Sequence, residues 1–137
     1  MHRDATGFAA LQPGTPIGPH AVTVGLAANE RYWRAAGADH PALRDGALYP
    51  PIAANLTVLA FQATCPEPVI QTRQRVVCHR RVQAGCELVT TGAVTARYAK
   101  RGRDYVDITV TVTAGPDAES VWTSEVTFTP ARTRSAA

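Results

Sequence analysis

The apolar residues of this chain change their spacing near Val69, and this change constrains the fold more than any other feature of the sequence. Between Pro51 and Thr64 the apolar residues repeat as they do on a helix, and most of the remaining surface of this segment is apolar too. The stripe consists of Ile52, Ala53, Leu56, Leu59, Ala60 and Ala63. A helix that is apolar on most sides is typically buried, so the pattern predicts a long buried helix.

After this helix, apolar and polar residues alternate, as they do in strands with one buried face. The predicted strands cover residues 70–82, 86–98, 105–113 and 121–129, and turn-forming residues separate them. The clearest alternation places Val106, Ile108, Val110 and Val112 on one face. The last strand places Trp122, Ser124, Val126 and Phe128 on one face. Because the strands are consecutive and the turns are short, we expect an antiparallel ladder.

The first third of the chain shows weaker patterns. Residues 1–20 are rich in Gly, Pro and Thr, and we expect them to be irregular. Residues 21–26 predict a short strand, and residues 29–36 predict a short helix with Asn29 at its N-cap and Gly37 just past its end. The order of these elements predicts an α+β fold whose sheet curls around the long helix. The exposed side of such a sheet often needs a second subunit to cover it.

Size and composition limit the classes of function. A chain of 137 residues is long enough for one domain, and its 45% hydrophobic and 18% charged residues exclude a disordered chain. The longest apolar stretch is too short and too polar to cross a bilayer, and no secretory signal is visible, so we expect a cytoplasmic protein. Three cysteines without a CxxC pair and four scattered histidines predict no metal site, and we expect no cofactor. The net charge of +3 is too small and too dispersed to favour nucleic acid as a partner.

The loop from Gly37 to Pro51 carries the densest set of reactive side chains. They are Asp39, His40, Arg44, Asp45 and Tyr49. The loop leads to the N-terminus of the long helix, where unpaired N–H groups and partial positive charge can polarise a carbonyl oxygen. A carboxylate and an imidazole beside it can transfer protons. The same residues also suit an ordinary loop whose polar side chains cap turns, and their spacing leaves both interpretations open.

Three segments between Thr15 and Pro130 resemble the MaoC-like hot-dog family of (R)-specific enoyl-thioester hydratases and dehydratases. They are YWRAAGADHPALRD, ALYPPIAANLTVLAFQ and RRVQAGCELVTTGAVTARYAKRGRDYVDITVTVT. The resemblance implies one hot-dog domain over residues 1–137, in which a curved antiparallel sheet wraps around one long central helix. It leaves an irregular lead-in over residues 1–14 and a frayed tail over residues 131–137. It also implies that two such domains pair, that a thioester lies along their interface, and that backbone N–H groups at the start of the central helix bind the thioester oxygen.

Catalytic members of this family carry a loop of the form G-D-x-N-P-x-H-x-D, whose Asp and His handle water and a substrate proton. When Pro41 is aligned with the Pro of this loop, Ala38 occupies the position of the catalytic Asp and Leu43 that of the catalytic His. Neither side chain accepts a proton. His40 falls on the Asn and Asp45 on the trailing Asp. The chain therefore resembles the half of a two-domain or heterodimeric dehydratase that has lost the dyad and shapes the acyl-chain tunnel.

Two functions remain open from the sequence. The first is the substrate-tunnel subunit of a dehydratase or hydratase that acts on acyl or polyketide thioesters of CoA or an acyl carrier protein. The second is a stand-alone hot-dog enzyme with a rebuilt site, in which Asp39, His40 and Asp45 carry out dehydration, isomerisation or cyclisation. A thioesterase is less favoured, because the long helix lacks a carboxylate. The partner is a dyad-carrying hot-dog subunit or a second copy of the chain.

The resemblance also points to residues that contact the substrate. They are Tyr49, Pro51, Ile52 and Asn55. Asn55 is singled out because an amide on an otherwise apolar, buried helix needs a hydrogen-bond partner. That partner is either a loop carbonyl or the substrate.

Overall fold

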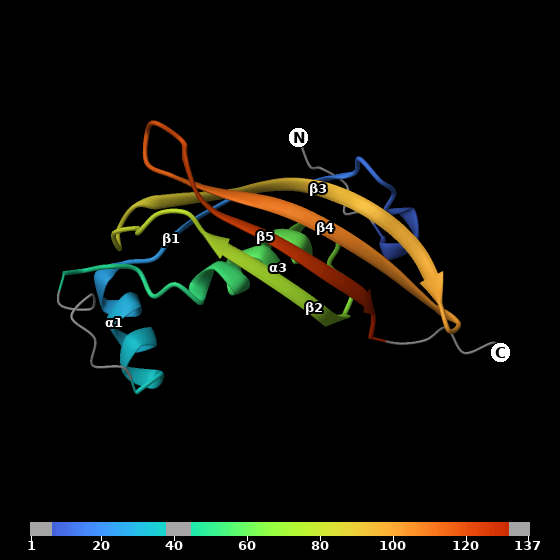
Figure 1. Cartoon of the computed structure of the whole chain (residues 1–137), viewed down its shortest axis with the longest axis horizontal. Helices are drawn as coiled ribbons and strands as arrows, with labels where there is room; N and C mark the ends of the chain where they lie inside the picture. Colours follow the sequence, from blue (N-terminus) through green and yellow to red (C-terminus); the bar gives the residue numbers. More distant parts are fainter. Residues whose placement is uncertain (1–6, 38–44, 132–137) are drawn as a thin grey trace.

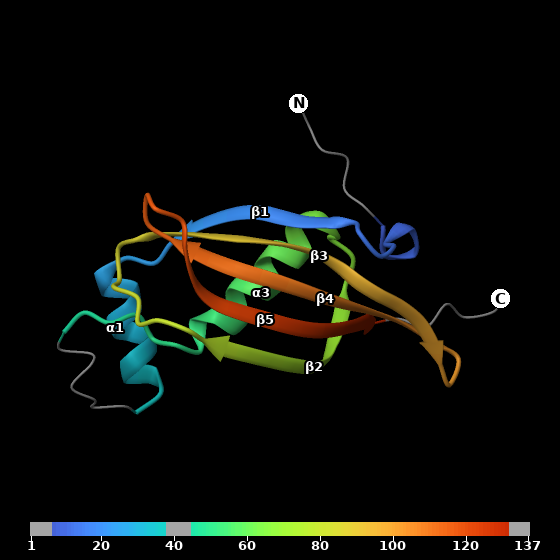
Figure 2. The same cartoon turned by 45° about the horizontal axis from the view of Figure 1, so that its top comes forward.

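A computed structural model describes residues 7–37 and 45–131, which form a five-stranded sheet curved over one central helix. The predicted hot-dog architecture of the α+β class, a curved antiparallel sheet around a central helix, is confirmed. The elements are η1 (Phe8–Ala10), β1 (Pro16–Thr23), α1 (Leu26–Ala35), α3 (Ile52–Thr64), β2 (Val69–Cys78), β3 (Glu87–Lys100), β4 (Arg103–Ala114) and β5 (Glu119–Pro130). Figures 1 and 2 show α3 on the concave side of the sheet and α1 at one end of the molecule.

The strand order is β1-β3-β4-β5-β2, and every neighbouring pair is antiparallel. The hairpins β3–β4 and β4–β5 form as predicted. The expected pairing of β2 with β3 across the turn at residues 83–85 is wrong, because β2 pairs with β5 and β3 pairs with β1. The segment between β2 and β3 instead bonds to the loop before α3: Ala47 bridges Gln83, and the Leu48 N–H donates to the Val82 carbonyl at 2.7 Å. These hydrogen bonds hold the connection between β2 and β3 against the loop before α3, at one end of the sheet.

The N-terminal part of the chain is more ordered than its composition predicts. β1 begins at Pro16, inside the segment expected to be irregular, and the predicted strand over residues 21–26 is wrong at its end because Leu26 already begins α1. Within the expected lead-in, Phe8 and Leu11 are buried. The Arg97 guanidinium holds this turn in place, because it donates to the carbonyls of Phe8 at 2.8 Å and Leu11 at 3.0 Å.

The predicted faces of the last two strands are confirmed. The alternating apolar residues of β4 are at most 1% exposed, and those of β5 are also buried. They face α3, where Phe61 stacks on Phe128 with ring centroids 4.1 Å apart. Each buried aliphatic or aromatic side chain of this size stabilises the fold by roughly 1.5–3 kcal/mol. The alternation of apolar residues in β4 and β5 therefore supplies much of the core.

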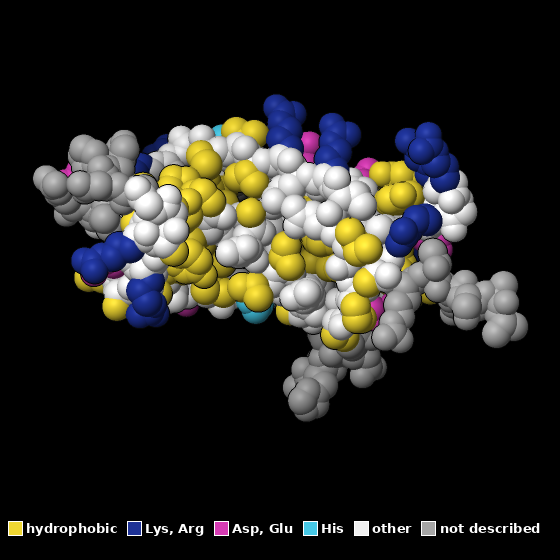
Figure 3. All heavy atoms as spheres, turned by 90° about the horizontal axis from the view of Figure 1, so that it is seen from below, with side chains coloured by type: hydrophobic (Ala, Val, Ile, Leu, Met, Phe, Trp, Pro, Cys, Tyr) yellow, Lys and Arg dark blue, Asp and Glu magenta, His cyan; other side chains and the backbone are white. Residues whose placement is uncertain are grey.

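The prediction that α3 is buried on most sides is wrong for the isolated chain. Its buried residues are Ile52, Ala53, Leu56, Thr57, Ala60 and Phe61. Leu59 is 45% exposed, and Asn55 and Ala63 are exposed beside it. We call these three residues the open face of α3. Figure 3 views this side of the molecule and shows hydrophobic side chains gathered on it, with Lys and Arg side chains around the margin.

No helix among the described residues has both the length and the apolar character that a membrane crossing requires.

Gly92 in β3 tests the close packing of the sheet. A Cβ added there would collide with the Thr109 carbonyl and lie 2.7 Å from the Cα of Val110. We expect Gly92→Ala to lower the free energy of unfolding by roughly 2–4 kcal/mol, measured by urea denaturation. Gly25→Ala is the control, because no atom lies within 4 Å of the added carbon, and there we expect a loss of at most about 1 kcal/mol. Equal losses in the two variants would contradict this prediction.

Candidate functional site

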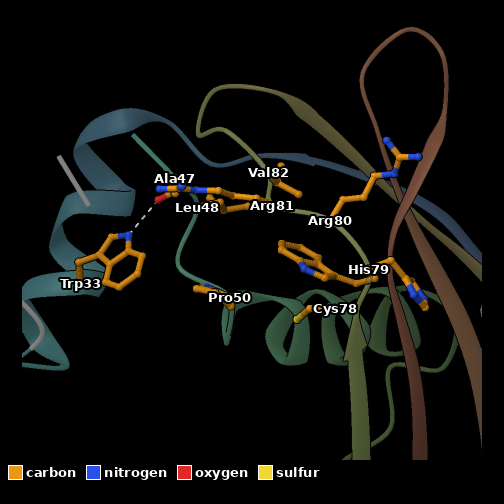
Figure 4. A pocket seen from close by; sticks show the side chains of 10 residues that line it. Trp33, Ala47, Leu48, Pro50, Cys78, His79, Arg80, Arg81 and Val82 are labelled. Atoms are coloured by element: carbon orange, nitrogen blue, oxygen red, sulfur yellow. Dashed lines mark hydrogen bonds between the residues drawn. The ribbon is translucent and has the colours of Figure 1, made fainter. Parts of the chain in front are cut away.

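The main candidate site is a pocket of about 530 Å³ near the N-terminal end of α3. Four segments enclose it: α1, the loop that leads into α3, the segment after β2, and β5 (Figure 4). The lining residues are Trp33, Ala47, Leu48, Pro50, Cys78, His79, Arg80, Arg81, Val82 and Trp122. The inner walls are mainly apolar, whereas the residues at positions 79–81 form a basic and polar rim. An apolar chain with a polar or anionic end group suits such a lining.

A hydrogen-bonded clamp fixes one wall of the pocket. The Asn29 Nδ2 and the Trp33 Nε1 both donate to the Ala47 carbonyl at 2.9 Å. The Asn29 Oδ1 also accepts a bond from the Tyr49 N–H at 2.8 Å. Asn29 and Trp33 lie one helical turn apart, so both side chains reach the same loop. The clamp holds residues 47–49 against α1 at the point where the chain enters α3.

The sequence pattern indicates a different role for Asn29. It predicted an N-cap, but Gly25 occupies the N-cap of α1, and Asn29 lies inside the helix and is 2% exposed. An Asn near a helix start resembles a cap in sequence, and only the loop that it contacts shows its role. The i, i+4 spacing of Asn29 and Trp33 was the available signal. The predicted position of Gly37 is confirmed, because Gly37 follows the last residues of α1 with a φ of +70°.

The wall also includes the segment that follows β2. Besides the Leu48–Val82 bond, the Ala84 N–H donates to the Gly46 carbonyl at 2.9 Å. The loop before α3 and the segment after β2 therefore form a short two-stranded arrangement at the end of the molecule. This arrangement positions Pro50 and Leu48 beside Val82 in the pocket lining.

The first turn of α3 offers few free donors. Pro50 and Pro51 have no N–H group. The N–H groups of Ile52, Ala53 and Ala54 donate to the carbonyls of Tyr49, Pro50 and Pro51 at 3.0, 3.1 and 3.1 Å respectively. A thioester oxygen that used one of these three N–H groups would have to displace an existing bond. The oxygen-binding role that the resemblance implies for the helix start is therefore weakened in this chain.

The candidate catalytic residues are only partly described. Asp39 and His40 lie outside the described residues, as do Ala38 and Leu43. Asp45 is exposed, and its Oδ2 lies 3.4 Å from the Arg81 Nη2 at the pocket rim.

The candidate substrate-contacting residues separate into two groups. Tyr49 is half-buried beside the clamp, with its ring edge-on to Trp33 at 5.0 Å between centroids. Pro51, Ile52 and Asn55 are absent from the pocket lining, because Ile52 points into the core while Pro51 and Asn55 are exposed. The expectation that Asn55 is a buried amide is therefore wrong, because it lies on the open face of α3.

The two arginines of the pocket rim form only weak ion pairs. The Arg80 Nη1 lies 3.3 Å from the Glu119 Oε2, and the Arg81–Asp45 pair has a similar separation. All four side chains are more than half exposed, so each pair contributes about 1 kcal/mol or less. The arginines can therefore exchange these carboxylates for an anionic group on a ligand. The His79 Nε2 is 2.8 Å from the Thr123 Oγ1, so one side of this imidazole is already engaged.

The three thiols lie in different surroundings. Cys78 is exposed and lines the pocket, whereas Cys65 is fully buried at the end of α3. Burial raises the pKa of the Cys65 thiol, and the charge of Glu67 raises it further, although a backbone hydrogen bond opposes both effects. Within residues 7–37 and 45–131, no group of three His, Cys, Asp or Glu side chains is arranged to hold a metal ion.

Comparison with known proteins supports the fold. No protein-family model matches the sequence, and no curated protein matches it. Among solved structures, the chain is similar to the truncated HadBC (3R-hydroxyacyl-ACP dehydratase) complex from Mycobacterium tuberculosis, with 24% identity and a TM-score of 0.69 over 85% of this chain and 96% of that one. It is also similar to a MaoC-like dehydratase from Rhodospirillum rubrum, with 15% identity and a TM-score of 0.72 over 92% and 97% of the two chains.

A third similar structure is the ChsH1-ChsH2 complex from Mycobacterium tuberculosis, with 11% identity and a TM-score of 0.70 over 87% and 98% of the two chains. These similarities define the class: the chain has the hot-dog fold. More particularly, the similar structures include a MaoC-like dehydratase and chains of two-component complexes, which confirms the fold that the resemblance implied.

Asn29 tests the clamp. We expect Asn29→Ala to lower the free energy of unfolding by about 2–3 kcal/mol, because it removes two hydrogen bonds and leaves the half-buried Tyr49 N–H without its acceptor. Urea denaturation measures the loss. Asn55→Ala is the matched control, since it makes the same change at an exposed helical position, and there we expect a change within about 0.5 kcal/mol. Similar values for the two variants would show that the clamp does not stabilise the chain.

The rates at which Cys78 and Cys65 react with an alkylating reagent test whether the pocket is open to solvent. We expect iodoacetamide to label Cys78 faster than Cys65 by on the order of tenfold or more, because Cys65 is buried and its raised pKa leaves little thiolate at neutral pH. Peptide mapping by mass spectrometry measures the two rates. Labelling of Cys65 in the folded chain should rise as the pH increases toward its raised pKa. The Cys78→Ser variant controls for unfolding: rapid labelling of Cys65 in that variant would contradict the prediction.

Proposed function

We propose that this chain is the substrate-tunnel subunit of a heterodimeric (R)-specific dehydratase or hydratase that acts in the cytoplasm on acyl or polyketide thioesters. The observation that carries this proposal is the pocket at the start of α3, whose described lining is largely apolar and contains no carboxylate. Addition or removal of water at a thioester requires a positioned acid and base. The pocket offers a place for the acyl chain without an acid–base pair of its own.

Two features of the chain agree with a loss of catalytic function. In the resemblance to the hot-dog family, the positions of the catalytic Asp and His hold Ala38 and Leu43. In the structure, the first three N–H groups of α3 donate to carbonyls of its own leading turn. The first feature leaves no proton-transferring side chain at the two catalytic positions. The second leaves none of these three N–H groups free to bind the thioester oxygen. Neither feature affects the walls that would hold an acyl chain.

The exposed apolar surface supports a protein partner. Leu59 is exposed on the open face of α3, and Ile70 and Val77 are 45% and 38% exposed on β2. β2 is also an edge strand of ten residues, so one side of its backbone has no neighbouring strand within the described sheet. Long, apolar edge strands promote aggregation unless they are covered. A second hot-dog subunit that pairs along the edge of β2 would cover this edge, and the Asp/His pair that it carries would supply the chemistry.

Similar solved structures support a two-chain assembly. The HadBC structure is described as a 3R-hydroxyacyl-ACP dehydratase complex, and the ChsH1-ChsH2 structure is also a complex. The alignment spans 96% and 98% of those two chains, so the likeness concerns whole hot-dog chains. By this analogy, the thioester carrier is CoA or an acyl carrier protein, and the basic residues of the pocket rim would face its phosphate groups.

One observation favours a second candidate, a stand-alone hot-dog enzyme with a rebuilt site. Asp45 places a carboxylate within 3.4 Å of Arg81 on the pocket rim. Together with Asp39 and His40 of the preceding loop, it would then supply the proton transfers for dehydration, isomerisation or cyclisation. This candidate predicts activity of the chain without a partner.

Hydration of a short trans-2-enoyl thioester by the purified chain separates the two functions. We expect no loss of the conjugated ultraviolet absorbance above the buffer rate, because the chain lacks the acid–base pair. We expect the same thioester to change the fluorescence of Trp33 and Trp122, both of which line the pocket. Turnover should appear only when a hot-dog subunit that carries the Asp/His pair is added.

Turnover by the chain alone would contradict the subunit proposal. In that case, loss of the rate in His40→Ala and Asp39→Asn would establish the rebuilt site. Asn55→Ala serves as a control variant, since its side chain lies outside the pocket.

A further inference from the structure

Two polar side chains near the pocket each have a buried atom with no hydrogen-bond partner among the described residues. The Ser124 side chain is fully buried, and its Oγ has no partner. The Gln74 Oε1 accepts a bond from the Gln71 Nε2 at 2.7 Å, but the buried Gln74 Nε2 has no acceptor. An unsatisfied buried polar group costs roughly 1–3 kcal/mol, so such groups are rare and need an explanation.

The sheet register places both groups beyond one end of the pocket. Cys78 and Trp122 line the pocket and lie opposite each other on β2 and β5. The next residues on the same face are Val76 opposite Ser124, and after them comes Gln74. Alternate residues of a strand share a face, so Ser124 lies roughly 7 Å beyond Trp122, and Gln74 lies one step further. The two groups therefore lie beyond the lining residues in one direction, along the sheet face that α3 covers.

This part of the sheet is less covered than the rest. α3 packs more closely against β1 than against β2. Consequently, the residues of β2 on the face toward α3 keep some exposure: Cys78 is exposed, and Val76 and Gln74 are half-buried. Neither Ser124 nor Gln74 lines the pocket, so a ligand chain would reach them by continuing from Cys78 along this partly exposed stretch of β2.

We infer that Ser124 and Gln74 recognise an oxygen atom on the ligand chain, several carbons beyond the thioester. This inference rests on the proposed function, because it requires that an acyl thioester occupies the pocket. A keto oxygen would accept hydrogen bonds from the Ser124 hydroxyl and the Gln74 amide. A hydroxyl would bond to Ser124 as donor or acceptor.

The two side chains lie on a diagonal of the β2–β5 pair, and diagonal neighbours are about 7 Å apart, so one oxygen can lie between them. A plain alkyl chain satisfies neither group. The ligand class is therefore an oxygenated acyl chain, such as a partly reduced polyketide, rather than a saturated fatty acyl chain.

The two tryptophans provide a direct readout, because the chain has only two and both line the pocket. The probes are the decanoyl thioester of N-acetylcysteamine and its analogues with one hydroxyl or keto group at successive positions from carbon 5 outward. Fluorescence titration gives the affinity of each probe. We expect at least one oxygenated analogue to bind the natural chain about five- to tenfold more tightly than the decanoyl probe, the effect of one neutral hydrogen bond.

Variants then assign the preference to the two side chains. Ser124→Ala and Gln74→Leu should each reduce the preference of the oxygenated analogue over the decanoyl probe to within about twofold, because each removes one hydrogen-bonding group. Ser120→Ala makes the same change at an exposed position on β5 and should retain the full preference. The thermal midpoint of Ser124→Ala should stay equal or rise, because the variant loses an unsatisfied hydroxyl.

The possible results separate this inference from the proposed function. Equal binding of all probes by the natural chain, or a preference that survives both substitutions, would overturn the inference and leave the tunnel role intact. Failure of every thioester, including the decanoyl probe, to change the fluorescence would overturn the proposed function as well.

Discussion

One helix must cover a sheet that is too wide for it, and the rest of the structure follows from this mismatch. A helix with its side chains is about 10–12 Å across, whereas five strands at about 4.8 Å spacing extend over about 20 Å. The sheet reduces the mismatch by curving around α3, as Figure 1 shows. The cover remains uneven, because α3 packs closely on β1 and leaves the inner face of β2 partly exposed. The pocket and the half-buried Gln74 both lie toward this less covered side.

The fold was predictable wherever the pattern of apolar residues is compatible with only one arrangement of the element. The four alternating apolar residues of β4 all lie on one face of the strand, so the sequence alone predicts that they are buried under α3. The apolar stripe of residues 52–63 likewise predicts the helix α3. Predictions failed where two solutions had similar local patterns. α3 is apolar on two sides, and only the geometry of the sheet decides that Phe61 is buried while Leu59 is exposed. Likewise, β2 has two strands with which it can pair, and bonds made by residues 82–84 outside the sheet direct it to β5.

The candidate site shows the same division. The sequence located the segment that enters α3, and it identified Tyr49 and Asp45 as part of it. It did not identify Asn29, Trp33 and Trp122, because these residues come from α1 and β5 and meet the loop only in the folded chain. A clamp made by distant residues leaves no local signal beyond the i, i+4 spacing of Asn29 and Trp33. In the folded chain these residues form a hydrogen-bonded frame around one wall of the pocket.

The hydrogen bonds of this frame indicate which constraint acts on the pocket. Buried polar groups are costly, and those of the clamp are all satisfied: the Asn29 amide bonds to Ala47 and Tyr49. Beyond the pocket along β2 and β5, the Ser124 Oγ and the Gln74 Nε2 are not satisfied. A chain that only needed a stable core would gain by replacing both with apolar residues of similar size. Their position next to the pocket, along the direction in which a bound chain would extend, gives the unsatisfied pair a role that packing does not, namely contact with a ligand. Stability then accounts for the clamp and binding for the unpartnered pair, within one continuous wall that runs from α1 to the inner face of β2.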